Sequence, residues 1–388
     1  IGVPAARCRT LSDRLGKVQN VAAFEVAMFR HVVHIAEPIG TVRAENVTNL
    51  VDRPDVELAL LALAVGVLSG VKGSAVGVAW QLRRTPKLPS NAIGVAGFYS
   101  TQDADSEGEE GKFFVWTPDE IHAVLGDEAE VFMTAYGVTP GGDFEGKNIL
   151  EFVGDLDQRP ALAEARRKLF EAREQRVHPG RDEKVLTGWN GLMIRGMVIA
   201  ARALDRPELA ESARHASDFL RQNLWRDGRL LAVHKDDRAR FPAYLDDYAF
   251  LADGLLELLQ TEWRSEDLEW ACELADCLLE HFEDKTHGGF FFTADDHEKL
   301  VHRPKSFSDD ATPAGAGIAT RVLVRLGHLL ARSDYLMAAE RSLRAAWAAL
   351  ERYPHAHCAL LNALEELLQP GETVILRGDP LQLSDWRA

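Results

Sequence analysis

The sequence is poor in cysteine and in recognisable cofactor motifs. Its 388 residues include four cysteines, and no two of them form a Cys-x-x-Cys pair. This pattern argues against a disulfide framework, a zinc ribbon and a dithiol redox centre. The histidines between the expected helices, His234, His287, His297 and His302, form no His-x-x-x-His or similar metal motif, and there is no glycine-rich phosphate loop and no Gly-x-Ser-x-Gly elbow. We therefore predict neither a metal nor a cofactor.

The sequence also lacks a positive net charge and a long apolar run. The net charge of −16 makes the chain a poor candidate for binding nucleic acid or an anionic membrane surface. The longest apolar run, residues 58–71, is shorter than a membrane-spanning helix requires, and no charged segment precedes it as in a signal peptide. We therefore expect a cytoplasmic protein without a membrane or nucleic-acid partner. The sequence does not indicate its oligomeric state.

The composition changes near residue 97. Residues 1–96 hold 11 Lys and Arg against 7 Asp and Glu, a net charge of +4, whereas residues 97–388 carry −20. The earlier segment is also almost free of aromatic residues. We therefore expect residues 1–96 to be an atypical N-terminal segment and residues 97–388 to form the main domain, with a C-terminal part that is incomplete.

Apolar residues recur at helical spacing through most of the second half of the chain. The predicted helices are residues 161–176, 185–204, 208–225, 243–262, 266–284, 311–331, 333–350 and 356–369. Gly and Pro pairs separate many of them, and they fall into hairpins that begin near residues 185, 243 and 311.

Short β-prone segments follow some of the helices. They begin at Gly228 and Gly289, and residues 97–100 and 112–116 resemble an earlier copy of the same feature. Helix pairs that alternate with short hairpins are typical of an α/α toroid, in which inner helices form a ring and outer helices surround it. An open solenoid of the same hairpins is the structural alternative. We predict a mainly α fold of the (α/α)6-barrel type with short β-hairpins at one mouth.

Pairs of acidic residues occur at the start of the predicted inner helices. They are Asp182-Glu183, Asp246-Asp247 and Asp309-Asp310. Aspartate is favoured at helix starts because it accepts hydrogen bonds from free N–H groups there, so capping alone explains one carboxylate of each pair. The doubling suggests that one carboxylate caps while its neighbour points elsewhere.

The densest acidic segment is residues 103–111. The spacing of its oxygens resembles the start of an EF-hand loop, but position twelve is Phe114 instead of Glu. A solvated turn between two strands is the simpler interpretation. In the functional interpretation, Asp103 and Asp105 face a substrate over the mouth.

Other candidate binding residues lie near the same helix starts. Trp189 offers a face on which a sugar ring can stack, and Asn190 can read hydroxyl groups, although a core tryptophan explains Trp189 equally well. Tyr248 adds an aromatic partner to the Asp246-Asp247 pair. Arg303 and Lys305 supply cations close to Asp310 and either bind an anionic group or form a salt-bridged rim.

Five segments together resemble the thioredoxin-domain-containing proteins related to spermatogenesis-associated protein 20. The segments are residues 97–116, 144–150, 184–193, 243–251 and 288–294. The resemblance implies an N-terminal thioredoxin-like domain, which residues 1–96 do not resemble, followed by an (α/α)6 barrel akin to the six-hairpin glycosidases and the N-acylglucosamine 2-epimerases. It therefore implies a role with carbohydrates and a small-molecule partner that is a sugar.

This resemblance leaves two functions open. In a glycosidase-like enzyme, Asp103 or Asp105 would act against Asp246 or Asp247, with the two carboxyl groups about 6.5–9.5 Å apart for inversion. An epimerase would require a histidine, for which His234 and His302 are the candidates. The alternative is a non-catalytic scaffold that positions a thioredoxin-like redox domain absent from this chain.

Overall fold

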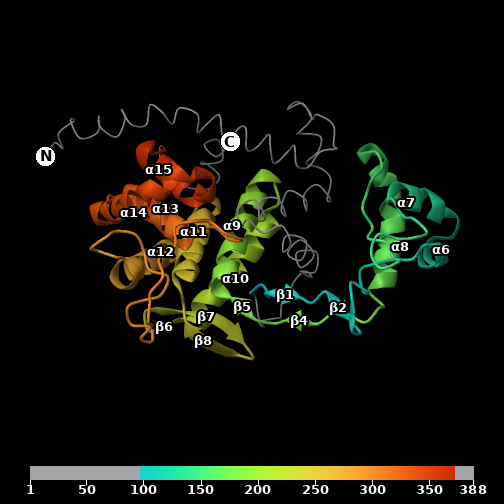
Figure 1. Cartoon of the computed structure of the whole chain (residues 1–388), viewed down its shortest axis with the longest axis horizontal. Coiled ribbons are helices and arrows are strands. Elements are labelled where there is room, and N and C mark those ends of the chain that lie inside the picture. Colours follow the sequence, from blue (N-terminus) through green and yellow to red (C-terminus); the bar gives the residue numbers. More distant parts are fainter. Residues whose placement is uncertain (1–96, 372–388) are drawn as a thin grey trace. The chain divides into compact units, whose positions relative to one another are not determined.

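A computed structural model describes residues 97–371, and the expectations for residues 1–96 and 372–388 lie outside this part of the chain (Figure 1). The described α-helices are α6 (Pro118–Leu125), α7 (Ala129–Ala135), α8 (Ala163–Arg173), α9 (Thr187–Ala203), α10 (Pro207–Leu224), α11 (Leu245–Thr261), α12 (Ser265–Cys277), α13 (Gly315–Leu330), α14 (Ser333–Arg352) and α15 (Cys358–Leu368). The described strands are β1 (Thr101–Gln102), β2 (Asp105–Ser106), β3 (Glu109–Glu110), β4 (Arg181–Asp182), β5 (Val185–Leu186), β6 (Trp225–Arg226), β7 (Arg229–Lys235) and β8 (Arg238–Pro242). A π-helical turn, Leu278–Phe282, continues α12.

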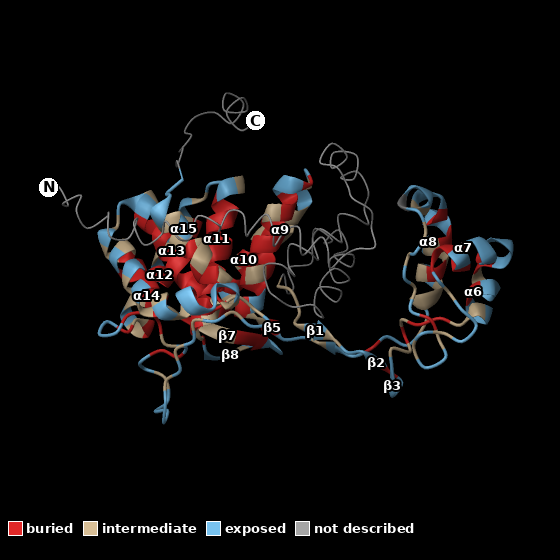
Figure 2. Cartoon of the chain, turned by 45° about the horizontal axis from the view of Figure 1, so that its top comes forward, coloured by how far each residue is buried: buried red, intermediate tan, exposed pale blue. Residues whose placement is uncertain are grey.

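The helices from α9 onward form two layers. The inner helices α9, α11, α13 and α15 pack side by side in this order, and the outer helices α10, α12 and α14 each pack on the inner helix that precedes them. Figure 2 shows that buried residues concentrate along the inner helices, where α9, α11 and α13 are buried over most of their length. The predicted mainly α fold, with helix pairs of the α/α-barrel type, is confirmed.

The inner helices α9 and α11 approach each other at two glycines. A Cβ atom at Gly191 would lie 2.6 Å from the backbone nitrogen of Leu251, and one at Gly254 would lie 2.9 Å from the carbonyl oxygen of Gly191. Any larger residue would therefore force the two backbones apart. The loss of helix propensity at these glycines is offset by close packing between the helices.

Strands β5 to β8 lie at one end of the helices (Figure 1). β7 pairs with β5, β6 and β8, all antiparallel. Because β5 runs directly into α9 and β8 leads into α11, these strands lie at the N-terminal end of the inner layer. The predicted strand after Gly228 is confirmed as β7.

The other strands that the sequence predicts are not formed as expected. Residues 97–100 form no strand, and residues 112–116 and the segment after Gly289 each contribute only an isolated antiparallel bridge, Trp116 with Asn148 and Phe290 with Glu283. The hairpin of the acidic segment is instead β2–β3, where Glu107 and Gly108 both have positive φ angles, as a two-residue turn of this hand requires.

Residues 116–172 have a hydrophobic core of their own, built from α6, α7 and α8. The helical spacing predicted only the last of these. α6 begins with a capping box in which Thr117 and Glu120 bind each other's backbone N–H groups, and Pro118 is its first residue.

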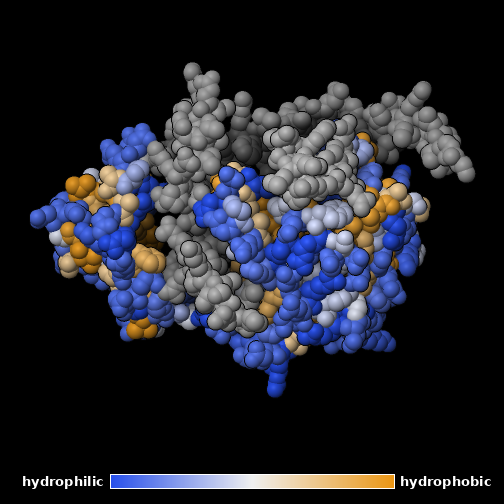
Figure 3. Space-filling view, turned by 180° about the vertical axis from the view of Figure 1, so that it is seen from behind, coloured by the Kyte–Doolittle hydropathy of each residue, from blue (hydrophilic) through white to orange (hydrophobic). Residues whose placement is uncertain are grey.

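Hydrophilic residues cover most of the described surface seen in Figure 3, and apolar residues occur there in separate patches. Within residues 97–371, none of the helices combines the length and apolar character needed to cross a bilayer.

Candidate functional site

The N-terminal ends of the inner helices, here called the mouth, are held together by aspartates. Asp247, in the first turn of α11, accepts a hydrogen bond from the backbone N–H of Gly188 in α9 at 2.8 Å. Its other carboxylate oxygen accepts one from the N–H of Tyr244 at 2.9 Å. Burial raises the pKa of Asp247 to about 7, against the effect of these two donors. Asp247 therefore joins the starts of two inner helices and has both oxygens engaged.

Asp246 contacts the inner helix on the other side. Its part-buried carboxylate accepts a hydrogen bond from the backbone N–H of Gly315, the first residue of α13. A Cβ atom at residue 315 would lie only 2.0 Å from Oδ1 of Asp246, so the carboxylate fits because this residue is glycine. Burial raises the pKa of Asp246 to about 6, and the hydrogen bond from Gly315 opposes that rise.

Asp309 continues the pattern to α15. One carboxylate oxygen accepts from the N–H of Ala314 at 2.8 Å and the other from the N–H of Ala359 at 3.1 Å. Its neighbour Asp310 is exposed. The hypothesis that one acid caps a helix while its neighbour points elsewhere therefore describes Asp309 and Asp310. It does not describe Asp246 and Asp247, which both contact helix starts, on opposite sides of α11.

Aromatic side chains accompany these carboxylates. Trp189 follows Gly188 in the first turn of α9 and is 46% exposed, so it is not a core residue. The rings of Tyr244 and Phe292 are stacked, with centroids 4.9 Å apart, and Phe292 is 37% exposed. The ring of His297 lies 5.7 Å from that of Tyr244. The mouth therefore carries aromatic rings that are at least partly exposed.

The structure corrects two of the predicted binding residues. Asn190 is buried, and its amide binds the backbone N–H and C=O of Phe98 and the C=O of Leu186. Tyr248 is fully buried, and its hydroxyl accepts hydrogen bonds from the N–H of Leu230 and the guanidinium of Arg229. Because both side chains are buried and hydrogen-bonded within the protein, they join different segments of the chain and do not face a ligand at the mouth.

The two predicted cations are also engaged by the protein. Lys305 donates hydrogen bonds to the Asp284 carboxylate and the Gly288 carbonyl, each at 2.8 Å. Its ammonium group holds the pKa of Asp284 well below the ordinary value. Arg303 donates to the carbonyl of Thr293 at 2.5 Å and lies over the ring of Phe291. These cations stabilise the loop before α13 instead of facing Asp310.

Asp103 and Asp105 are exposed and flank the β1–β2 connection. The Asp103 carboxylate accepts a hydrogen bond from the N–H of Asp105 at 3.3 Å, as in an Asx turn. Among residues 97–371, no hydrogen bond or ion pair joins either of them to Asp246 or Asp247. Their assignment as catalytic partners stays a prediction.

The two histidines considered for epimerisation lie in different surroundings. His234, in β7, is buried and meets the ring of Phe219 edge-on, whereas His302 is exposed. Within the described part of the chain, neither histidine forms a hydrogen bond or ion pair with a mouth carboxylate.

Sequence reasoning missed the aromatic pair formed by Tyr244 and Phe292 and the role of Gly315. Both aromatic residues lie inside motifs, residues 243–251 and 288–294, but their stacking joins segments 48 positions apart. The sequence indicated the role of Gly315 only weakly, by a glycine at a helix start shortly after an acidic pair. The mouth thus combines a part-buried carboxyl group of raised pKa, Asp246, with aromatic rings on neighbouring segments.

The resemblance drawn from the motifs is confirmed by curated relatives. The chain is 29% identical over 332 residues to human spermatogenesis-associated protein 20, covering 73% of this chain and 42% of that protein. An uncharacterized protein of Caenorhabditis elegans is 28% identical, with 73% of this chain and 45% of that protein covered. The chain thus spans less than half the length of these relatives. No protein family model matches it.

Solved structures with a similar arrangement include carbohydrate-active proteins. Cellobiose 2-epimerase of Spirochaeta thermophila matches with 15% identity and a TM-score of 0.40, covering 52% of this chain and 57% of that one. An inactive variant of an α-1,6-mannanase of Salegentibacter, in complex with α-1,6-mannotetrose, matches with 14% identity and a TM-score of 0.36, covering 75% and 69%.

Proposed function

We propose that the mouth binds and processes a neutral sugar, with Asp246 as the acid. The observation that carries this proposal is the part-buried Asp246 carboxyl, whose pKa of about 6 allows it to hold a proton close to neutral pH. An acid of this strength can protonate the oxygen that leaves when a glycosidic bond breaks.

Asp247 is a positioning residue in this proposal. Both of its oxygens accept backbone hydrogen bonds, so it fixes the first turn of α11 and with it the neighbouring carboxyl group. Asp103 and Asp105 are the candidates for the second carboxylate, which would activate the attacking water. Trp189 and the stacked rings of Tyr244 and Phe292 supply faces for the sugar ring.

We infer a neutral sugar because the cationic side chains predicted to bind an anionic group are already bound by other parts of the protein. Lys305 and Arg303, which the sequence offered for an anionic group, are bound to Asp284 and to backbone carbonyls. The exposed carboxylate of Asp310 would repel a carboxylate or phosphate on the substrate. Neutral oligosaccharides are therefore favoured over uronic acids.

The experiment is a thermal-unfolding screen with neutral sugars, N-acyl sugars and uronic acids. A ligand at 100 times its Kd stabilises the folded chain by about 2.7 kcal/mol, which raises the midpoint measurably. Trp189→Ala should abolish the shift, whereas Trp263→Ala, which removes a tryptophan that is 50% exposed outside the mouth, should retain it. A shift that survives Trp189→Ala unchanged would exclude the proposed stacking surface.

The second candidate is a non-catalytic scaffold that partners a thioredoxin-like domain. The observation in its favour is that Asp247 and Asp309 each accept two backbone hydrogen bonds, so helix capping accounts for part of the acidic pattern. A cooperative unfolding transition that no sugar class shifts would favour the scaffold.

A further inference from the structure

One exposed aromatic residue close to the mouth has an unusual backbone conformation. Phe241, in β8, has a φ angle of 62°, and it is 64% exposed. A left-handed conformation is uncommon for a residue with a bulky side chain. The residue that follows is Pro242, and the position before a proline favours extended backbone, which disfavours this conformation further. Phe241 therefore lowers the stability of the folded chain unless its ring gains something in return.

The strand pairing shows that burial of the ring is not the return. In the antiparallel pair of β7 and β8, His234 lies opposite Ala239 and Leu231 lies opposite Pro242. Side chains alternate along a strand, so residue 241 belongs to the same side of β8 as Ala239, which packs against the main hydrophobic core. Phe241 is exposed instead. The left-handed backbone thus accompanies a ring that faces solvent and not the core.

Phe241 lies close to the aromatic pair of the mouth. It precedes Tyr244 by three residues, and three residues of chain span at most about 11 Å. The backbone N–H of Leu245 donates to the carbonyl of Phe292 at 3.0 Å, which holds the stacked partner of Tyr244 beside the same segment. Within residues 97–371, Phe241 has no ring or cation–π contact of its own. Its ring is therefore a separate aromatic surface next to the stacked pair.

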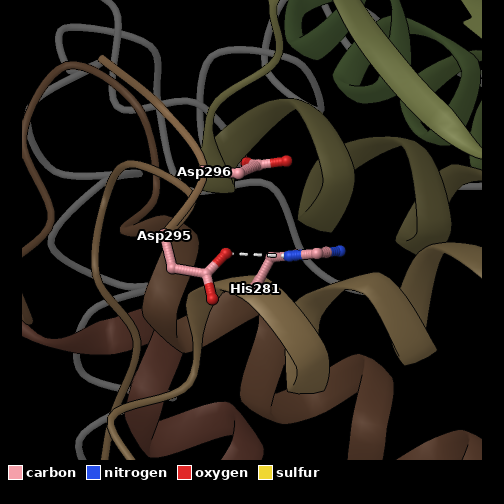
Figure 4. A group of neighbouring side chains, drawn as sticks. All are labelled: His281, Asp295 and Asp296. Carbon is pink, nitrogen blue, oxygen red and sulfur yellow. Dashed lines mark hydrogen bonds and ion pairs between the residues drawn. The ribbon is translucent and has the colours of Figure 1, made fainter. Parts of the chain in front are cut away.

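The loop that carries Phe292 is held by contacts that do not involve Phe241 (Figure 4). Nδ1 of His281, in the π-helical turn that continues α12, is hydrogen-bonded to the carboxylate of Asp295 at 2.8 Å. Arg229 of β7 binds both carboxylate oxygens of Asp296. A change at residue 241 should therefore leave the position of Phe292 as it is.

We propose that Phe241 stacks on a second sugar unit, next to the one that contacts Tyr244 and Phe292, so that the mouth binds an oligosaccharide over several units. This inference rests on the proposed function. An exposed ring kept in a strained conformation is expected at a binding site, where strained residues concentrate. A residue with only a structural role at this position would be one that tolerates a positive φ angle, such as glycine.

The test compares short and long oligosaccharides. Calorimetric titration of the full chain with cellobiose and cellotetraose, and with α-1,6-mannobiose and α-1,6-mannotetraose, measures Kd for the wild type, Phe241→Ala and Phe241→Trp. Phe241→Ala should bind the tetrasaccharide about tenfold more weakly or worse, because the contact area of one aromatic ring is lost, and the disaccharide within about twofold of the wild type. Phe241→Trp keeps an aromatic ring and should restore the tetrasaccharide affinity.

Urea denaturation separates this role from a structural one. Phe241→Gly should have a higher midpoint than Phe241→Ala, because glycine adopts a positive φ angle without the cost that a Cβ atom imposes. Both variants should lose the same tetrasaccharide affinity. A ring that the fold requires would instead lower both midpoints equally and leave the dependence of Kd on sugar length unchanged.

The matched control is Trp263→Ala, which removes another half-exposed aromatic residue, in the segment after α11. It should bind the tetrasaccharide as the wild type does. Unchanged tetrasaccharide binding in Phe241→Ala, or an equal loss for both sugar lengths, would overturn this inference and leave the proposed function standing. A wild-type chain that binds none of the four sugars would overturn the inference and also count against the proposed function.

Discussion

Replacing Asp246 by Asn should change how the stability of the protein depends on pH. The unfolded chain titrates this carboxyl near its ordinary value of 3.8, whereas burial raises its pKa to about 6 in the folded chain. At 1.36 kcal/mol per pH unit, this difference corresponds to about 3 kcal/mol.

The sign follows from which state holds the proton. Between about pH 4 and pH 6 the folded chain keeps the proton that the unfolded chain has lost, so this carboxyl lowers the free energy of unfolding as pH rises. The contribution is fully present below about pH 4 and is lost as pH rises through about 6. Asp247, with a pKa of about 7, adds a loss of the same sign.

The assay is urea denaturation of the wild type and Asp246→Asn at several values between pH 4 and pH 7.5. The free energy of unfolding of the variant, relative to that of the wild type, should increase by up to about 3 kcal/mol over this range. Asp246→Ser removes the same carboxyl and should show the same slope with a different offset. A difference that does not vary with pH, or that falls as pH rises, would refute the inferred burial of this carboxyl.

Three further substitutions test the packing of the inner helices. Gly191→Ala should destabilise the protein by about 1–3 kcal/mol in urea denaturation, because its Cβ would meet the backbone of α11, whereas Gly141→Ala, with open space around it, should be nearly neutral. Asp253→Asn should cost about 3–5 kcal/mol, since the buried carboxylate neutralises two buried arginines of α9 and α13; a loss below 1 kcal/mol would show that water reaches this network. Asn190→Ala should cost about 1–3 kcal/mol, because it leaves the polar backbone atoms of Phe98 unpaired, and hydrogen exchange at the Phe98 amide should accelerate.

Helical periodicity was enough to predict the inner and outer helices. The predicted spans 208–225 and 333–350 differ from α10 and α14 by no more than two residues at any end. The apolar stripe that produces the period is the same face that packs on the neighbouring layer. α6 and α7 are too short to establish a period, but the capping box of Thr117 and Glu120 was a readable signal for the first of them.

The segment after Gly289 shows where prediction from local sequence fails. Its aromatic residues predicted a strand, yet Phe290 is buried in the main core, Phe291 lies under Arg303 and Phe292 stacks on Tyr244. β-propensity reflects packing on a pleated surface, and here tertiary contacts take each ring in a different direction.

The sequence predicted which types of residue lie at the mouth better than it predicted what each residue does there. The doubled acids Asp246 and Asp247 lie at a helix start as expected, whereas Asp182 lies in β4, before α9 begins at Thr187. The partners of Asp247 and Asp309 on neighbouring helices are beyond the reach of local rules. Asn190 was read as a ligand group, whereas its partner Phe98 is 92 positions away. Only the tertiary structure distinguishes a polar residue that faces a ligand from one that is hydrogen-bonded within the protein.

The most direct test of the account is turnover of a sugar that the unfolding screen identifies, followed by the appearance of new reducing ends. The wild type should release product with a rate that falls as pH rises above about 6, where Asp246 loses its proton. Asp246→Asn, folded and still binding the sugar, should be slower by a factor of about 100 or more. Full turnover by Asp246→Asn would contradict the assignment of this carboxyl as the acid.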